Sequence, residues 1–214
     1  MKLAVLMTFF RKVDDRFQID SYQNARSVYL FLTDVGHILL RLVDRFRLKM
    51  FVAQLQNDPV HLHLGCGEQR KPNCINIDWR KTIATDFVQD ITALPLPEAS
   101  VDSIESYHVI EHLGKNDAER MLANWYRTLK PNGKVVIECP NFDETVKEYL
   151  AGNQERIYNV YGYRRFPGDA HQFGYNFERL RQALAAAGFS NIVNTEPQDY
   201  HIMEEPCLRV EAKK

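Results

Sequence analysis

The nine residues His61–Gln69, HLHLGCGEQ, decide the fold of this chain. Leucine alternates with histidine up to Leu64, which is typical of a short strand, and Gly65 and Gly67 then permit a tight turn. In parallel α/β sheets, ligands bind in the crevice beyond the carboxyl ends of the strands. We therefore expect a ligand at this turn.

Strand patterns alternate with helical patterns after Pro59, which indicates a parallel sheet with crossover helices. Helices are expected to begin at Asn116 and Asn176, whose side chains can cap them. Residues 142–175 are rich in aromatic side chains and show no clear period. The expected strands are residues 60–64, 75–78, 86–90, 100–108 and 134–140, with further candidates at 191–196 and 207–214.

The overall composition is that of an ordinary globular protein. With 27 basic and 28 acidic side chains the net charge is -1, so nothing in the balance indicates a nucleic-acid partner. The four cysteines follow no disulfide spacing, and no leader with a cleavage site is recognisable. We expect reduced thiols and a cytoplasmic location.

Residues 1–57 are expected to form an N-terminal helical extension beside a main domain at 58–214. The apolar run at 28–43 is interrupted by Asp34, His37 and Arg41, well short of the ~20 residues that span a bilayer. The extension carries nine basic and five acidic side chains, a net charge of +4. It is a candidate for packing on the main domain, for self-association, or for peripheral contact with the inner membrane surface.

The glycine turn favours a ligand without phosphates. Arg70 stands where a dinucleotide loop needs its third glycine, and Glu68 would repel a pyrophosphate. S-adenosylmethionine has an adenosine end, no phosphate and a positive sulfonium. Acids at the ends of the next two strands, Asp78 and Asp90, can accept hydrogen bonds from its ribose and adenine.

Together these motifs resemble class I S-adenosylmethionine-dependent methyltransferases, in particular small bacterial members with G-C-G, D-x-x-x-L-P, H-x-x-E-H-L and L-K-P-x-G. The resemblance covers residues 60–141 closely. It implies a Rossmann-like, seven-stranded sheet with helices on both faces. Many members carry an acid where this chain has His63, and only Glu68–Cys74 separate the turn from the second strand, too few for the usual helix. The crevice should be more open on that side.

The resemblance also implies the cofactor-binding residues. The two glycines would line the methionine part, Asp78 the ribose, and Asp90 with Ile91 the adenine, while Tyr107 and His108 would face the sulfonium or the acceptor. The complete predicted set is His63, Gly65, Cys66, Gly67, Asp78, Trp79, Asp90, Ile91 and Tyr107.

The candidate general bases are His108, Glu111, His112 and His171. Glu111 and His112 either act together as a general base or only orient their loop. The segment H-V-I-E-H does not match the H-E-x-x-H of zinc proteases. A zinc site built from His61, His63, Cys66 and Cys74 lacks a compact ligand spacing, so no metal site is predicted.

The expected function is methyl transfer from S-adenosylmethionine to an oxygen or nitrogen of a small-molecule or sugar acceptor. Aromatic side chains and arginines between residues 158 and 175 either bind a sugar or planar acceptor or form a small satellite core. Two other functions stay open: a non-catalytic cofactor-binding scaffold, and an NAD-dependent oxidoreductase with a degenerate loop.

Overall fold

The computed structural model describes residues 21–55 and 58–214, and side chains from residue 36 onward. The chain divides between Val43 and Asp44 into two compact units, which are taken separately here. Helix α2, Ser21–Gln54, begins in the first unit and ends in the second. The predictions for residues 1–20 and for a boundary at residue 57 fall outside the described residues.

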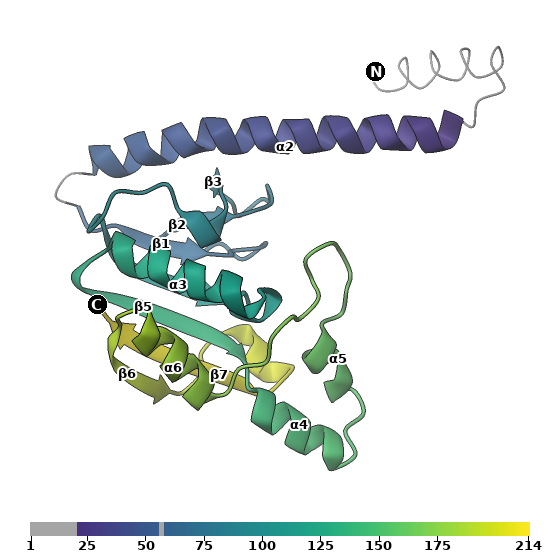
Figure 1. Ribbon diagram of the computed structural model, residues 1–214, viewed down its shortest axis with the longest axis vertical. Coiled ribbons are helices and arrows are strands. Elements are labelled where there is room, and N and C mark those ends of the chain that lie inside the picture. The colour runs from purple at the N-terminus through teal and green to yellow at the C-terminus, as the bar shows by residue number, and fades with distance from the viewer. Residues whose placement is uncertain (1–20, 56–57) are drawn as a thin grey trace. The chain divides into compact units, whose positions relative to one another are not determined.

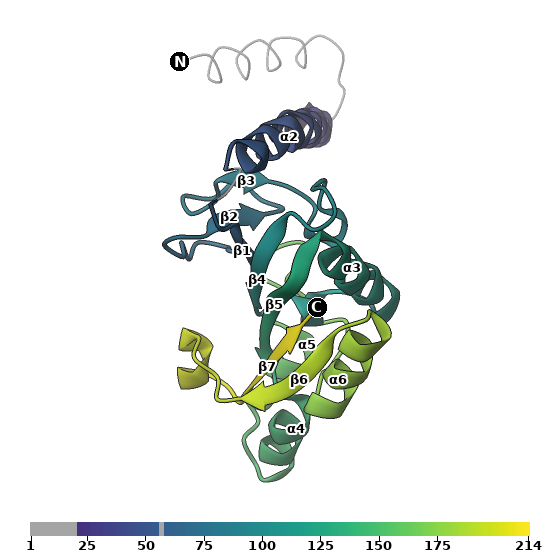
Figure 2. The same ribbon diagram turned by 90° about the vertical axis from the view of Figure 1, so that its left-hand side faces the viewer.

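The second unit is built on a seven-stranded sheet in the order β3-β2-β1-β4-β5-β7-β6 (Figure 2). Strands β1 to β5 run parallel, and β7 runs antiparallel to both of its neighbours. The strand order reverses between β1 and β4, which places the crevice beyond their carboxyl ends. The predicted Rossmann-like class I sheet is confirmed. Its strands are β1 His61–Leu64, β2 Ile75–Asp78, β3 Phe87–Val88, β4 Val101–Tyr107, β5 Leu129–Pro140, β6 Ser190–Thr195 and β7 Cys207–Lys213.

The two predicted helices of the main domain are α3, Lys115–Thr128, and α6, Phe177–Ala186. The side chain of Asn176 caps α6 as predicted, by accepting from the Arg179 amide at 2.9 Å. The predicted cap at Asn116 is wrong. Helix α3 begins one residue earlier, and no side chain caps it, because the capping position is occupied by Gly114, which has no side chain.

The region without a clear period contains two helices, α4 at Phe142–Leu150 and α5 at Arg156–Tyr161. The side chain of Asn141 caps α4. Three short 3-10 turns complete the unit: η1 Ile91–Ala93, η2 Ile110–His112 and η3 Tyr200–Met203.

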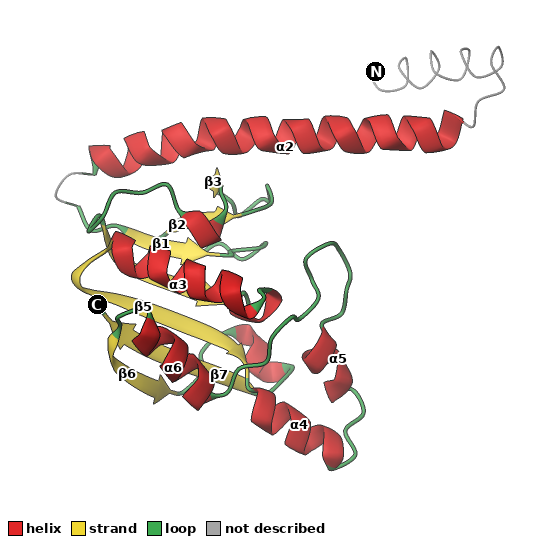
Figure 3. Ribbon diagram, in the orientation of Figure 1, coloured by secondary structure: helices red, strands yellow, loops and turns green. Residues whose placement is uncertain are grey.

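Helices α3 and α6 cover one face of the sheet (Figures 1 and 3). Trp125 of α3 is fully buried there, and its indole N–H donates to the Ile91 carbonyl at 2.8 Å. This bond ties α3 to the turn that follows β3. Because an indole N–H is costly to bury without an acceptor, the bond also fixes the register of α3 against the sheet.

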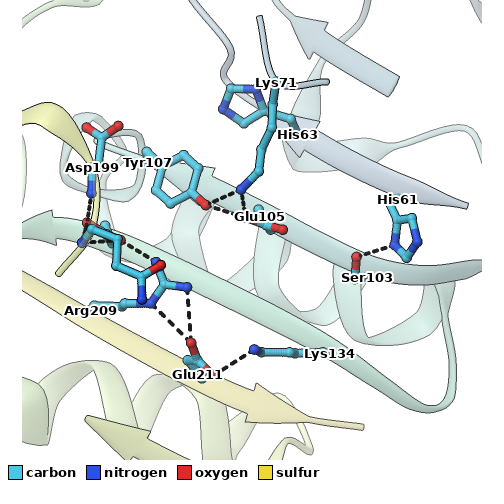
Figure 4. Close-up of polar contacts among 12 residues, drawn as sticks. His61, His63, Lys71, Ser103, Glu105, Tyr107, Lys134, Asp199, Arg209 and Glu211 are labelled. Carbon is cyan, nitrogen blue, oxygen red and sulfur yellow. Dashed lines mark hydrogen bonds and ion pairs between the residues drawn. The ribbon is translucent and has the colours of Figure 1, made fainter. Parts of the chain in front are cut away.

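The other face of the sheet carries paired polar side chains (Figure 4). Alternate residues of a strand point to opposite faces, and the β4 residues on this side are Ser103, Glu105 and Tyr107. Ser103 hydrogen-bonds His61 at 2.7 Å. Arg209 on β7 pairs with the buried carboxylate of Glu138 on β5. This face therefore depends on ion pairs and hydrogen bonds where the first depends on apolar packing.

The last turns of α2 belong to the second unit and contribute to its core. Leu48 and Val52 are buried in the apolar cluster. The carboxylate of Asp44 is buried and accepts from the Val88 amide of β3 at 2.8 Å. Within the described residues, no helix combines the length and apolar character needed to cross a membrane.

Candidate active site

A cavity of about 1200 Å³ opens beyond the carboxyl ends of β1, β2 and β4. All nine predicted cofactor-binding residues and all four candidate bases line it. They come from segments as distant in sequence as His63 and His171. The structure therefore brings the whole predicted set into one cavity, while the role of each residue stays a prediction.

The glycine turn presents bare backbone to this cavity. Gly65 has φ +74°, and a Cβ there would lie 2.1 Å from a methyl carbon of Val109. Gly67 has φ +51°, and a Cβ there would meet nothing within 4 Å. Both positions need the left-handed backbone that glycine adopts without strain. Gly65 is also required by packing, whereas Gly67 leaves open space for a ligand.

Asp78, at the end of β2, is buried and holds the turn in place. Its carboxylate accepts from the amides of Gly67 and Arg80, each at 2.8 Å. A carboxylate offers about four acceptor positions, so acceptor capacity remains for ligand hydroxyls. Asp90 is exposed, and one of its oxygens accepts from the amide and hydroxyl of Thr92 as the cap of η1.

Two titratable side chains of the turn are held in their neutral forms. Burial raises the pKa of the Cys66 thiol to about 11, which makes it a packing residue and a poor nucleophile. Burial also lowers the pKa of His63, although a hydrogen bond to Asn76 at 2.9 Å opposes that shift. His63 therefore lies neutral where the resemblance expects an acid.

Lys71 places its ammonium group next to Glu105 and Tyr107 (Figure 4). It donates to the Tyr107 hydroxyl at 2.7 Å. Burial alone would raise the pKa of Glu105, but the hydrogen bonds from Lys71 and Tyr107 lower it overall. Sequence reasoning missed Lys71 and Glu105. Glu105 and Tyr107 lie two residues apart on one strand, so their side chains point to the same face of the sheet. That spacing was the available signal.

His108 follows β4 with φ +52°, an uncommon conformation that functional sites often contain. Its Nδ1 lies 3.4 Å from Glu111 Oε1 and 3.2 Å from Glu205 Oε1. Burial alone would lower the pKa of His108, but contacts with Cys207, Glu111 and Glu205 raise it well above its usual value. The His108 contact likewise lowers the pKa of Glu111 against the effect of burial. We conclude that His108 is a cation and Glu111 an anion.

The loop carrying His171 is fastened to η2 by main-chain bonds. The Glu111 carbonyl accepts from the Gln172 amide at 2.7 Å and from the Phe173 amide at 3.2 Å. The Gln172 side-chain amide also donates to the His112 carbonyl at 2.8 Å. These bonds bring His171 beside His112, and the two rings meet edge to face with centroids 4.9 Å apart.

Sequence reasoning also missed the wall formed near η3, where Asp199, His201 and Glu205 line the cavity. No motif marks this segment, and only the tertiary fold brings it beside His108.

The aromatic region divides between its two predicted roles. Tyr175 is buried in the core, whereas Tyr158 and Tyr163 are about half exposed at the cavity and stack with their rings 5.3 Å apart.

The sheet order, the antiparallel β7 and the glycine turn after β1 define the class I methyltransferase fold. Residues 68–137 match the family model described as "Methyltransferase domain". A solved structure of a SAM-dependent methyltransferase from Methanosarcina mazei aligns with 77% of this chain and 96% of its own, at 15% identity and a TM-score of 0.53. That likeness concerns the fold alone.

Four curated relatives match by sequence, and two of them illustrate the range. A Mycolicibacterium smegmatis protein named "Probable S-adenosylmethionine-dependent methyltransferase" is 30% identical over 98 residues, covering 37% of each chain. The phosphoethanolamine N-methyltransferase of Plasmodium falciparum is 26% identical over 117 residues, covering 52% of this chain and 38% of its own. The chain therefore spans little more than a third of these relatives' lengths. Its residues 68–137 are thus similar to methyltransferase domains, and S-adenosylmethionine is the cofactor in the name of the Mycolicibacterium relative.

Proposed function

We propose that this chain transfers the methyl group of S-adenosylmethionine to an oxygen or nitrogen of a small-molecule or sugar acceptor. The observation that carries the proposal is one cavity in which the glycine turn and Asp78 meet a cluster of histidines and carboxylates. A ligand site and groups able to move a proton thus share one space. The Plasmodium relative is named for methyl transfer to nitrogen, which supports proposing nitrogen as well as oxygen as the acceptor atom.

The residues around the turn fit the cofactor. The open backbone at Gly67 would accommodate its amino-acid part, the remaining acceptor positions of Asp78 its ribose hydroxyls, and Asp90 with Ile91 its adenine. When bound, the cofactor supplies a methyl group whose C–S bond breaks with the electron pair kept by sulfur, as an acceptor lone pair forms the new bond.

The protein's part in the reaction is to position the acceptor and to remove its proton. Proximity and orientation supply most of the rate in such a transfer. Among the candidate bases, His108 is held as a cation by Glu111 and Glu205. It therefore stabilises negative charge, and proton removal falls to His112 or His171, which lie side by side.

The rim of the cavity favours an acceptor with a flat or sugar-like face. Tyr158 and Tyr163 stack in parallel planes, and the guanidinium of Arg165 lies 5.2 Å from the centre of the Tyr163 ring. Aromatic faces beside a guanidinium suit sugar rings and planar groups that carry a hydroxyl.

Calorimetric titration with S-adenosylhomocysteine, and separately with NAD, tests the cofactor assignment. The intact protein should bind the first and not the second. Asp78→Ala should abolish binding, and Asp78→Asn should weaken it, because both remove acceptor capacity at the turn. Asp102→Ala is the matched control: Asp102 also accepts a backbone amide, at 2.8 Å from Val60, but does not line the cavity. It should bind like the intact protein.

The other outcomes separate the alternative functions. Binding of NAD without S-adenosylhomocysteine would overturn the proposal in favour of an oxidoreductase. Binding of S-adenosylhomocysteine, with no transfer of labelled methyl to any of a panel of sugars, phenols and amines, would favour the scaffold. The rate of methyl transfer should fall at least tenfold in His171→Ala while cofactor binding is retained. This result would support placing the acceptor beside His171.

We further propose that the N-terminal helical extension, residues 1–57, whose last turns pack in the core of the second unit, contacts an anionic membrane surface or a second copy of the chain in the cytoplasm. On the last turns of α2, Phe46 and Met50 are 75% and 60% exposed. Co-sedimentation with anionic vesicles and size-exclusion chromatography should both respond to Phe46→Ser with Met50→Ser. Equal pelleting and equal elution of the intact and substituted chains would refute this proposal.

A further inference from the structure

Three side chains at one end of the cavity are arranged as a metal-ligand set. Glu111, His112 and His171 each place a ligand atom within 4.8 Å of the other two. Two imidazoles and one carboxylate form the donor set of zinc sites that keep an open coordination position. Zinc lies about 2.0–2.2 Å from such ligands, so the three side chains need only a small closure to share one ion.

The two histidines are held in the tautomer that a metal ligand requires. Nδ1 of His112 lies 3.2 Å from the Ala170 carbonyl, and Nδ1 of His171 lies 2.7 Å from the Asn159 carbonyl. A carbonyl can only accept, so each Nδ1 carries a hydrogen, which leaves Nε2 of the neutral ring as the nitrogen able to bind an ion. Metal-binding histidines characteristically donate their second ring nitrogen in this way, which fixes the ring and raises the basicity of the ligand atom.

The carboxylate of Glu111 is the second, independent sign of a cation. Its side chain is 3% exposed, and neither oxygen accepts a hydrogen bond within the part of the chain that the structure describes. Its ion-pair contact is with His108, at 3.4 Å. A buried carboxylate normally satisfies its oxygens with hydrogen bonds or a metal. One cation contact at this distance leaves most of that requirement unmet.

We propose that Glu111, His112 and His171 together bind one divalent ion of the zinc class, with a coordination position open to the cavity. This departs from the prediction of no metal site made from the sequence, which rejected H-V-I-E-H as a zinc-protease motif and did not combine Glu111 and His112 with His171. The main-chain bonds from Gln172 and Phe173 to Glu111 supply the rigidity, since they fix the loop carrying one ligand to the turn carrying the other two.

The ion would hold the acceptor and acidify it. A hydroxyl bound to zinc loses its proton near neutral pH far more readily than a free hydroxyl. The acceptor class is then a molecule with a hydroxyl that can coordinate a metal. The hydroxyl proton would pass to solvent water in the cavity, so His112 and His171 would serve as ligands, which replaces the proton-removing role proposed for them above. This role of the ion rests on the proposed methyl transfer, whereas the binding of the ion does not.

A neighbouring cluster provides the matched control. His108, Asp199 and His201 also place ligand atoms within 4.8 Å of one another. Two of the cluster's three members are already engaged, because both ring nitrogens of His108 have partners, Glu205 at 3.2 Å and Cys207 at 3.7 Å, and the Asp199 carboxylate is bonded to Nδ1 of His201. Substituting His201 removes a histidine from the same cavity without touching the proposed ligands.

The test is a titration of the full chain with Zn²⁺ buffered by a competing chelator, repeated with Co²⁺ and followed by its visible absorption. The intact protein should bind one equivalent of each ion, and Mg²⁺, which prefers oxygen ligands, should not compete. Glu111→Gln and His171→Ala should each weaken Zn²⁺ binding at least about 100-fold, and His201→Ala should leave it unchanged. Melting temperatures and S-adenosylhomocysteine binding report whether each variant is folded.

Each outcome decides the proposal. It is overturned if the intact protein takes up no zinc, if His171→Ala still binds it normally, or if His201→Ala loses it. Zinc binding that depends on Glu111 and His171 supports the site even in a protein that binds no S-adenosylhomocysteine. In that case the proposed methyl transfer would fail while the metal site stands.

Discussion

Removing the Glu138 carboxylate should destabilise the domain more than any exposed ion pair could. Glu138 is fully buried. It accepts from the Gln198 amide at 3.0 Å, from the Asp199 amide at 3.0 Å, and from Arg209. Hydrogen bonds to a charged group contribute about 1.5–3 kcal/mol each, and removing one partner of a buried ion pair costs about 3–5 kcal/mol. Arg209 keeps Glu211 as a partner at 3.1 Å, so Glu138→Ala should cost about 4 kcal/mol.

Urea unfolding followed by circular dichroism measures this cost. Glu138→Gln keeps an acceptor oxygen but loses the charge, so its loss should be roughly half as large. Glu178→Gln removes a carboxylate from an exposed pair with Arg181 and should produce no measurable change. A cost below about 1 kcal/mol for Glu138→Ala, or an equal cost for the Gln and Ala variants, would refute the reasoning.

Three further predictions concern the turn, the sheet edge and the polar face. Gly65→Ala should lower the melting temperature and abolish S-adenosylhomocysteine binding, since its φ of +74° and the nearby valine methyl leave no room for a Cβ; unchanged binding would contradict this. Asp44→Ala should lower the free energy of unfolding, measured in urea, by about 1–3 kcal/mol, because the buried Val88 amide loses its acceptor. An unchanged free energy of unfolding would contradict the role of Asp44 in holding α2 at the sheet edge. Burial raises the pKa of Glu105, but hydrogen bonds, first that from Lys71, lower it overall from its usual 4.5. A lowered carboxyl pKa contributes stability above about pH 4.5 that is lost as the pH falls, so Glu105→Gln should flatten the acid limb of the melting-temperature profile; parallel profiles would refute the pairing.

The sheet was predictable because each strand carries its own signal. The alternation before Gly65 marks β1, and the acids Asp78 and Asp90 mark the neighbouring strand ends, so the cavity wall nearest the turn followed from local pattern. The resemblance places several of the predicted cofactor-binding residues at those positions, and their role stays a prediction. The motif H-x-x-E-H-L likewise predicts His108 and Glu111, which line the cavity.

The rest of the site depends on contacts that no short pattern contains. Asp199 reaches the cavity because two backbone amides of its segment are held by Glu138, about 60 residues earlier in the chain. The pairing of His171 with His112 depends on a carbonyl accepting from the amides of Gln172 and Phe173. The predicted cap at Asn116 is wrong because α3 begins at Lys115, which puts Gly114, a residue without a side chain, at the capping position.

The shortest strand of the sheet also bears on how this protein behaves at high concentration. β3 has two residues and forms one edge of the sheet. Unpaired amides on such an edge invite strand addition from another molecule, which is a route to fibrils. Here the Val88 amide donates to Asp44 of the same chain. Asp44 of α2 thus protects this edge from pairing with a strand of another molecule.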